Sequence, residues 1–339
     1  MDGKEPAVAT LPKRALVAGG AGFLGAHLCR RLIADGFDVV AMDNLVTGSL
    51  ANLREPLREG HLRFLHRDVV QPCDMPVERV FNLACCASPV HYQAHPVQTL
   101  QTCLTGALNM LKLGHRHGAR VFQASTSEVY GEPETHPQVE SYRGAVSTIG
   151  PRACYDEGKR CAETLFFDYH RLYGVQIKVG RIFNTYGPYM REDDGRVVSN
   201  LILQALHRRP MTIHGDGSQT RSFCYVDDLV EGIVRLVESA DGFTGPVNLG
   251  NPHEVTVLEL AERIIEITGT RSRLVSRPMP VDDPTRRCPD ITLAREVLGW
   301  EPKVSLDEGL RRTIAWFEAR ERGARDIPVP AAEIDRDCA

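Results

Sequence analysis

The chain of 339 residues lacks several features that mark broad classes of protein. No apolar run approaches the roughly 20 residues that a membrane-spanning helix requires, so we expect no membrane partner. The formal net charge of −4 gives no general attraction to nucleic acid. Residues 1–13 are polar and lack the apolar segment of a secretory signal peptide. These absences favour a cytoplasmic protein with a disordered lead over residues 1–13.

The ten cysteines form no zinc or redox motif. None belongs to a C-x-x-C pair, and no pair of histidines has the spacing of a zinc site. We therefore expect no metal, and we interpret the cysteines as reduced, mostly buried thiols that act as small apolar side chains. Cys85 and Cys86 are adjacent, which is unusual, but neighbours on a strand point to opposite faces.

Apolar strands alternate with helices through the first half of the chain, and no internal repeat is present. The predicted strands span residues 14–18, 37–42, 63–65, 79–84, 121–124 and 175–182. The predicted helices span residues 22–35, 96–117 and 155–173. Strands joined by helices require right-handed crossovers, so this order predicts an α/β fold with a doubly wound parallel sheet of the Rossmann type.

The second half follows a looser pattern. Helices are predicted at 197–207, 226–239, 257–268 and 306–322, and short strands at 211–213 and 247–249. The loops are rich in Gly, Pro, Asp and Arg, which suits a smaller substrate-binding lobe. The predicted units are a Rossmann domain over 14–186 that exchanges a strand and a helix with the later chain, a C-terminal lobe over 187–325 and a flexible tail over 326–339.

A glycine-rich turn directly follows the first predicted strand. Gly19, Gly22 and Gly25 form G-x-x-G-x-x-G, with Phe23 and Leu24 between the last two glycines. A tight strand-to-helix turn with free backbone N–H groups, at the positive end of a helix dipole, suits a pyrophosphate.

Asp43 ends the second predicted strand, about 20 residues after the glycines, as in dinucleotide-binding folds. Its carboxylate can accept hydrogen bonds from the adenosine ribose and would repel a 2′-phosphate, so the pattern predicts NAD rather than NADP. The alternative is that Asp43 is a simple turn residue. The neighbouring loops supply further candidates for cofactor contacts, each of which could be ordinary loop chemistry: Asn44, Thr47, Gly48, Asp68, Val69, Leu83 and Ala84.

Tyr155 and Lys159 lie four residues apart on a predicted helix and therefore share one face. The nearby ammonium is expected to lower the pKa of Tyr155, which would make the phenol a proton acceptor near neutral pH. The strand at 121–124 ends in Ser125-Thr-Ser-Glu-Val-Tyr-Gly, where the hydroxyl of Thr126 can bind the same substrate oxygen as Tyr155.

Together these motifs resemble the extended short-chain dehydrogenase/reductase family. Thr126, Tyr155 and Lys159 match its catalytic hydroxyl, tyrosine and lysine. The resemblance implies that Lys159 also binds the nicotinamide ribose, while Tyr155 takes a proton from a hydroxyl as hydride moves to NAD. Longer segments, such as Pro151-Arg-Ala-Cys-Tyr-Asp-Glu-Gly-Lys-Arg and Asn248-Leu-Gly-Asn-Pro, narrow the resemblance to the UDP-glucuronate decarboxylases over residues 14–317.

This resemblance implies that a UDP-hexuronic acid is oxidised at C4. The ketone is then β to the carboxylate, so CO2 can leave with its electrons held as an enolate. Glu128 and Arg287 are implied to serve decarboxylation and protonation of C5. Arg287 could instead orient the carboxylate as a permanent cation or form a structural salt bridge, and Glu128 could be a solvated loop acid.

Position 127 separates this chain from related sugar-nucleotide enzymes. The 4,6-dehydratases carry Asp-Glu where this chain has Ser127-Glu128, and the 4-epimerases usually lack the acid that Glu128 provides. The alternatives to decarboxylation are therefore a 4-epimerase, a 4,6-dehydratase, or a non-catalytic NAD-binding scaffold. The expected product is UDP-xylose, UDP-4-keto-pentose or both.

The resemblance also implies a set of residues around the UDP-sugar. They are Tyr92, Asn109, Asn184, Arg191, Arg196, Val198, Gln219, Arg221 and Arg287, with Arg116 and Tyr169 as further candidates. Arginines suit bidentate contacts with phosphate, whereas Asn109, Arg116 and Tyr169 could equally be surface or packing residues.

Two segments depart from the resembled family. Ala84-Cys-Cys-Ala-Ser-Pro stands where the family has Ala-Ser-Pro-Ala-Ser-Pro, and Leu100-Gln-Thr-Cys stands where it has Leu-Lys-Thr-Asn. Gln101 thus replaces a lysine that could hold the uronate. Helices 96–117 and 155–173 can pair with a second copy as a four-helix interface, and the resemblance implies a homodimer.

Overall fold

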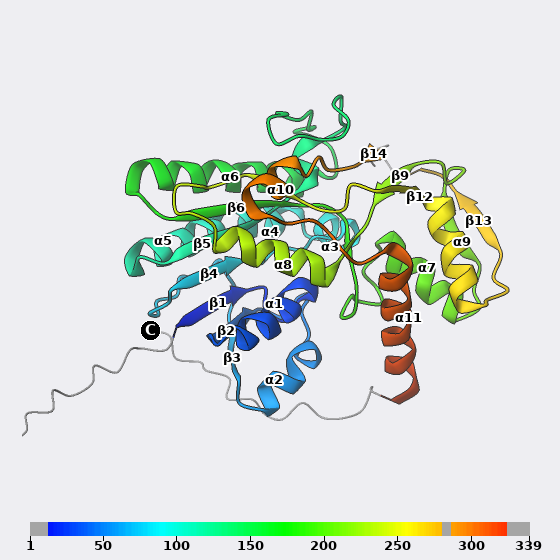
Figure 1. The fold of residues 1–339 in the computed structure, drawn as a ribbon, viewed down its shortest axis with the longest axis horizontal. Coiled ribbons are helices and arrows are strands. Elements are labelled where there is room, and N and C mark those ends of the chain that lie inside the picture. Colours follow the sequence, from blue (N-terminus) through cyan, green and yellow to red (C-terminus); the bar gives the residue numbers. More distant parts are fainter. Residues whose placement is uncertain (1–12, 280–285, 324–339) are drawn as a thin grey trace, which may run out of the picture.

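The computed structural model describes residues 13–279 and 286–323, so nearly all of the predicted lead and the whole predicted tail lie outside the described residues. A seven-stranded sheet crosses the molecule in the order β11-β6-β5-β4-β1-β2-β3, and every neighbouring pair is parallel (Figure 1). Its strands are β1 Arg14–Ala18, β2 Asp38–Asp43, β3 Leu62–His66, β4 Arg79–Asn82, β5 Arg120–Thr126, β6 Ile177–Ile182 and β11 Val247–Leu249. The predicted α/β fold is confirmed.

Helices cover both faces of the sheet because its strands are apolar on both sides. Ala15 and Val17 of β1 pack into one buried cluster, whereas Leu16 and Ala18 pack into a second. The first cluster includes α1 Phe23–Ala34 and α8 Val226–Val237, and the second includes α5 Ala107–His117 and α6 Ala153–Tyr173. Each fully buried Val, Leu, Ile or Phe contributes about 1.5–3 kcal/mol to these two cores.

The later part of the chain forms a separate set of helices beside the sheet, at the right of Figure 1. These helices are α7 Val197–Leu206, α9 Val257–Thr268 and α11 Leu306–Gly323. A capping box of Thr256 and Glu259 begins α9, and Gly269, in the left-handed conformation, ends it. Short strands accompany them: β7 Thr185–Tyr186, β8 Met211–His214, β9 Thr220–Ser222, β10 Cys224–Tyr225, β12 Glu254–Thr256, β13 Leu274–Arg277 and β14 Arg286–Arg287.

The long helix predicted at 96–117 has the right ends but is not uniform. It consists of α4 Pro96–Gln101, a π-helical segment η2 Thr102–Gly106 and α5. A π-helical turn shifts the side chains that follow, and an amphipathic stripe in the sequence does not reveal it. At Gly106, an added Cβ would lie 2.7 Å from the Val69 side chain, so this turn packs tightly against the loop after β3.

The prediction missed most of the short elements and displaced several strand ends by one or two residues. Strand β4 ends at Asn82, so Cys85 and Cys86 lie in the loop after it rather than on a strand. The missed helices have too few residues to show a periodic apolar pattern. They are η1 Leu50–Leu53, α2 Arg54–Arg58, α3 Pro89–Ala94, η3 Ser127–Tyr130 and α10 Thr292–Leu298.

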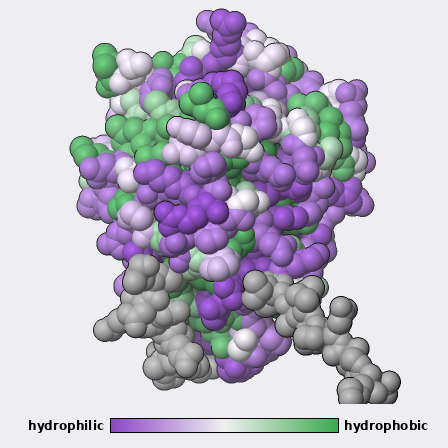
Figure 2. Space-filling view, turned by 90° about the vertical axis from the view of Figure 1, so that its left-hand side faces the viewer, coloured by the Kyte–Doolittle hydropathy of each residue, from purple (hydrophilic) through white to green (hydrophobic). Residues whose placement is uncertain are grey.

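No helix among residues 13–279 and 286–323 combines the length and apolarity that crossing a bilayer requires. The face at the left of Figure 1 is mainly hydrophilic, with hydrophobic residues in several separate groups (Figure 2). A cavity lies along the carboxyl ends of the sheet strands.

Candidate active site

A cavity of about 600 Å3 lies where the carboxyl ends of β1, β2, β4, β5 and β6 meet the C-terminal helices and strands. Ligands of doubly wound sheets bind at this edge, because the loops that leave parallel strands all meet there. Residues from both halves of the chain line the cavity, including the glycine turn after β1 and the arginines of β9 and β14.

The glycine turn brings the backbone close to the cavity. Gly19 has a φ of +80°, in the left-handed region that glycine tolerates. An added Cβ at Gly25 would lie 2.1 Å from the Gly19 carbonyl oxygen, so helix α1 can begin this close to β1 only with glycine there. Gly22 caps the helix with no side-chain hydrogen bond, which leaves the first N–H groups of α1 for an anion.

Asp43 is held beside this turn at the end of β2. Its Oδ2 accepts a hydrogen bond from the Ala21 N–H at 3.0 Å, and its Oδ1 accepts one from the Leu45 N–H at 2.8 Å. Burial raises the pKa of Asp43, and these two donors oppose the shift. Each carboxylate oxygen keeps a lone pair for a further donor, and Asp43 lines the cavity, so the site fits a dinucleotide with a free ribose diol.

Most of the predicted cofactor residues line the cavity. They are Gly19, Gly22, Phe23, Leu24, Gly25, Asp43, Asn44, Thr47, Val69, Leu83, Ala84, Tyr155 and Lys159. Gly48 and Asp68 do not line it and instead support it. A Cβ at Gly48 would lie 2.7 Å from Asp43 Oδ1, and Asp68 accepts a 2.8 Å hydrogen bond from the Asn44 amide.

Tyr155 and Lys159 face the cavity from the first turns of α6. The Lys159 ammonium donates to the Ala124 carbonyl at 2.9 Å, at the end of β5, and its Nζ lies 5.8 Å from the centre of the Tyr155 ring. Tyr92 of α3 stacks on Tyr155 with ring centres 5.0 Å apart and an interplanar angle of 5°. The buried Tyr92 hydroxyl has no hydrogen-bond partner among the described residues, which leaves it available to a ligand.

The expected lowering of the pKa of Tyr155 is wrong for the protein alone. Burial raises the pKa of Tyr155 well above its ordinary value, and a hydrogen bond with the Thr126 side chain opposes this only in part. Tyr155 is only 6% exposed, so its phenolate would lose nearly all of its contact with water. Sequence spacing shows the nearby ammonium but not the burial, which is the larger effect.

Glu128 lies between two arginines from distant parts of the chain. Its carboxylate is 2.7 Å from Arg152, at the start of α6, and 3.4 Å from Arg287, on β14. Burial alone would raise the pKa of Glu128, but Arg287 and Arg152 outweigh it and hold the pKa at about 2. Glu128 is therefore a carboxylate at neutral pH, and it orders both guanidinium groups beside Tyr155.

Arg152 and Asp156 are site residues that the sequence predictions missed. Asp156 is buried beside this cluster, and burial together with the charge of Glu128 raises its pKa to about 7, against the opposing effect of Arg152 and Arg287. Both residues belong to the same segment as Tyr155, at positions three before and one after it. The helical spacing of Arg152 and Tyr155 could have identified the arginine as a residue of the same face.

The predicted substrate residues separate into two groups. Eight line the cavity: Tyr92, Asn184, Arg191, Arg196, Val198, Gln219, Arg221 and Arg287. Arg221 of β9 and Arg287 of β14 are register partners in a parallel pair, which brings the two guanidinium groups to one side of the cavity. Asn109 lies away from the cavity and donates to the Val69 carbonyl at 3.0 Å. Arg116 pairs with Asp74, and Tyr169 packs on Tyr173, so neither lines the cavity.

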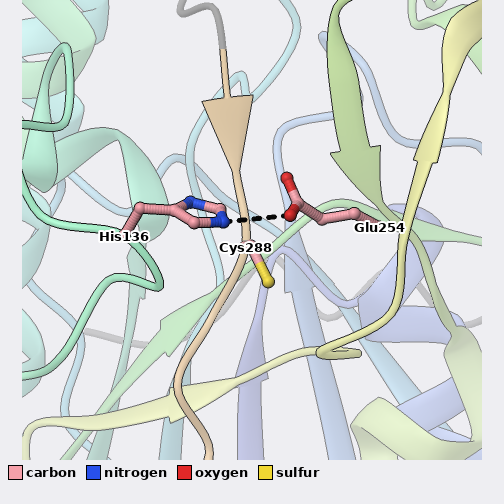
Figure 3. Close-up of side chains that lie close together, drawn as sticks. All are labelled: His136, Glu254 and Cys288. Carbon is pink, nitrogen blue, oxygen red and sulfur yellow. Dashed lines mark ion pairs between the residues drawn. The ribbon is translucent and has the colours of Figure 1, made fainter.

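His136, Glu254 and Cys288 form a cluster beside β14 whose ligand atoms lie within 4.8 Å of one another (Figure 3). His136 Nε2 lies 3.0 Å from Glu254 Oε2, but the Arg286 guanidinium also contacts this nitrogen at 2.8 Å. Burial raises the pKa of Cys288 to about 11, which keeps its sulfur protonated. The cluster is therefore an ion-pair group with its positive charge already supplied by Arg286.

Comparison with known proteins agrees with this geometry. The profile of the NAD dependent epimerase/dehydratase family matches residues 15–250. The chain is 52% identical over 310 residues to UDP-glucuronic acid decarboxylase 4 of Arabidopsis thaliana, covering 91% of this chain and 70% of the relative. It is 50% identical over 323 residues to UDP-glucuronic acid decarboxylase 1 of Danio rerio, covering 94% of this chain and 77% of that relative.

The fold is also similar to that of a solved mutant of UDP-glucuronic acid 4-epimerase from Bacillus cereus, in complex with UDP-4-deoxy-4-fluoro-glucuronic acid and NAD. The two share a TM-score of 0.82 and 26% sequence identity, over 90% of this chain and 99% of the other. Since 90% of this chain is covered, the similarity extends over both halves of the chain.

We predict that Glu128→Gln makes the stability of the protein less sensitive to acid. The folded-state pKa of Glu128 is about 2, below the value of about 4.3 in an unfolded chain. Its charge therefore contributes stability above about pH 4.3 that is lost as the pH falls toward 2. Urea unfolding at neutral pH and near pH 3 should show wild type losing on the order of 1–2 kcal/mol more than the variant. Glu262→Gln, at an exposed position of α9, is the matched control, and equal losses in wild type and Glu128→Gln would contradict the prediction.

Proposed function

Because the chain belongs to the NAD dependent epimerase/dehydratase family, and within it to the UDP-glucuronic acid decarboxylases, we propose that it is an NAD-dependent UDP-glucuronate decarboxylase. The observation that carries this proposal is the carboxylate of Glu128 held between Arg152 and Arg287, directly beside Tyr155. Tyr155 can serve the oxidation of a hydroxyl, and the two arginines are cations that can hold a uronate. The arrangement brings both kinds of group together.

The glycine turn and Asp43 are the residues that would hold NAD. When bound, NAD supplies the hydride acceptor for C4 of the sugar and returns the hydride later. The Asp43 carboxylate supports NAD over NADP, since a 2′-phosphate would meet its charge in a buried site. Lys159, fixed by the Ala124 carbonyl, keeps its remaining N–H donors for a ribose hydroxyl.

Tyr155 would accept the proton of the C4 hydroxyl through its Oη. Thr126, at the end of β5, holds that oxygen by a hydrogen bond and so helps to stabilise the phenolate. The stacked Tyr92 ring fixes the orientation of Tyr155. Because burial makes the phenolate costly, the proton returns readily to the sugar oxygen when the C4 hydroxyl is restored.

The ketone at C4 is β to the carboxylate, and loss of CO2 leaves an enolate whose negative charge lies on the C4 oxygen. The protonated Tyr155 can donate a hydrogen bond to that oxygen and stabilise it. Arg287, which is 1% exposed, supplies a fixed cation for the uronate. The low pKa of Glu128 supports a role as a carboxylate that positions Arg287, Arg152 or a water at C5, in place of donating its own proton.

Incubation with UDP-glucuronate and NAD is the direct test. We expect release of one CO2 per sugar, and proton NMR of the product should show a pentose, either UDP-xylose or UDP-4-keto-pentose. A hexuronic acid inverted at C4, without CO2 release, would instead indicate a 4-epimerase, the activity named for the Bacillus cereus neighbour. Loss of C6 hydroxyl from a dTDP-hexose would indicate a 4,6-dehydratase. Bound NAD without turnover of any UDP-sugar would indicate a non-catalytic scaffold.

We predict that Tyr155→Phe lowers kcat for CO2 release by roughly 10²–10⁴-fold, because the variant lacks the group that moves the C4 proton. Binding of UDP-glucuronate, measured by calorimetry, should change little because the ring still stacks on Tyr92. Tyr173→Phe, at the exposed end of α6, is the matched control and should retain wild-type kcat. Undiminished turnover by Tyr155→Phe would remove Tyr155 from the mechanism.

We further propose that the chain forms a homodimer through α4 and α6. These helices lie against each other, and α4 exposes Val97 at 70% and Leu100 at 37%, three residues apart on one face. Two copies of this pair would bury the apolar side chains in a four-helix interface.

We also propose that the protein is cytoplasmic. The nine cysteines among the described residues are free thiols, as a reducing compartment would keep them.

Light scattering tests the dimer. We expect about twice the 37.6 kDa of one chain at micromolar concentration, the dimer being the commonest assembly. Leu100→Glu places a charge in the proposed interface and should give a monomer. Val297→Glu, at an exposed apolar position of α10, should remain dimeric. A wild-type monomer at that concentration would contradict the proposal.

A further inference from the structure

Two free cysteines from different elements meet beside the proposed catalytic pair. Cys85 lies in the loop after β4, and Cys103 lies in the π-helical segment η2. Their sulfur atoms are 3.4 Å apart, which is thiol contact without a bond. An S–S bond is about 2.0 Å long, so a shift on the order of 1 Å would join them.

Gly158 explains why this pair lies against α6. A Cβ added at Gly158 would lie 3.0 Å from Cys103 Cβ and 3.1 Å from its Sγ, so a larger residue would push η2 away. Gly158 falls between Tyr155 and Lys159 on the helix. The sulfur pair therefore packs directly against the turn that presents both of these residues to the cavity.

The surroundings of the pair favour a thiolate. A hydrogen bond from Cys85 lowers the pKa of Cys103 to about 7, against burial, and the Lys159 ammonium lowers it further. The hydrogen bond with Cys103 and burial raise the pKa of Cys85 well above its ordinary value, so the thiolate of the pair forms on Cys103. A thiolate next to a thiol is the arrangement that reacts in disulfide formation.

The pair is also within reach of a small molecule. Cys103 is only 3% exposed, but Cys85 is partly exposed and lines the cavity of about 600 Å3. A peroxide is far smaller than this cavity. Cys86 also lines the cavity, yet the structure records no contact between its sulfur and that of Cys85 or Cys103 among the hydrogen bonds of the described residues.

We propose that Cys85 and Cys103 are a redox modification site, in which a peroxide converts the two thiols to a disulfide that switches the active site off. The thiolate of the pair attacks one peroxide oxygen, the O–O bond breaks, and a sulfenic acid and an alcohol or water form. The second thiol then attacks the sulfenic sulfur, the S–S bond forms, and the oxygen leaves as water. Two electrons pass from the sulfurs to the peroxide, and a dithiol reverses the change by exchange.

The disulfide would act on the catalytic pair in two ways. Drawing Cys85 and Cys103 together moves the loop that lines the cavity toward η2, and thereby alters the packing at Gly158. It also removes the thiolate whose charge offsets the Lys159 ammonium. Displacements of about 1 Å near reacting groups can cost up to about a hundredfold in rate, so we expect activity to fall at least about tenfold.

The first test needs no substrate. The reduced protein is treated with hydrogen peroxide, alkylated and digested with chymotrypsin, which can cleave after Tyr92 between the two cysteines, and its peptides are analysed by mass spectrometry. We expect a cross-linked peptide pair that contains Cys85 and Cys103 and that disappears after dithiothreitol. Cys85→Ser and Cys103→Ser should each abolish it, whereas Cys86→Ser should retain it. Absence of this cross-link in wild type, or a cross-link through Cys86 in its place, would overturn the proposal.

The second test measures activity and rests on the proposed function. For each protein the rate of CO2 release after peroxide is divided by the rate of its own reduced form. Wild type and Cys86→Ser should lose at least about tenfold and recover with dithiothreitol, while Cys85→Ser and Cys103→Ser keep a ratio near one. Full activity of the cross-linked wild type would overturn the switch. A reduced wild type without any activity would instead refute the decarboxylase assignment and leave the cross-link result standing.

Discussion

The arrangement of the site depends on the buried ion pairs of Glu128. This carboxylate follows β5, and its two arginines come from the start of α6 and from β14, which lies 159 residues away from it in the sequence. Burying such a group costs several kcal/mol per charge, and the pairing offsets that cost and keeps the carboxylate ionised, although an apolar group of similar volume could be as stable there. The ion pairs are therefore weak evidence for stability, and their consequence is geometric. They fix the distance between the sheet edge, the first turn of α6 and the strand that carries Arg287.

The parallel sheet and the C-terminal elements make this cluster possible. Parallel strands end at one edge, so the glycine turn, Asp43 and Thr126 meet there although each lies at the end of a different strand. The pairing of β14 with β9 then places Arg287 next to Arg221 and brings it to Glu128, two residues after Thr126. Neither half of the chain has a complete set of groups, and the cavity exists only where the two halves meet.

The parts of the site that follow local rules could be predicted from the sequence. The spacing of Tyr155 and Lys159, the glycine turn and the position of Asp43 depend on one helix and one strand–turn–helix unit. Other features depend on tertiary packing. They are the ion pairs of Glu128, the contact between Cys85 and Cys103, and the position of Asn109 away from the cavity. Burial is also a tertiary property. For this reason the sequence predicts the wrong direction for the shift in the pKa of Tyr155. The π-helical turn at η2 was missed because it changes hydrogen bonding without changing the apolar pattern.

The first turns of α6 connect these separate features. Arg152 pairs with Glu128, Tyr155 faces the cavity, Gly158 receives Cys103, and Lys159 bonds to the end of β5. Because a helix is stiff, a displacement at Gly158 is transmitted to Tyr155 and Lys159, which lie within one turn of it. The same stiffness that would hold the tyrosine for the proposed proton transfer thus exposes it to any change in the packing of η2. A site built on one helix gains precision and, for that reason, can be controlled through η2, which packs on the same helix at Gly158.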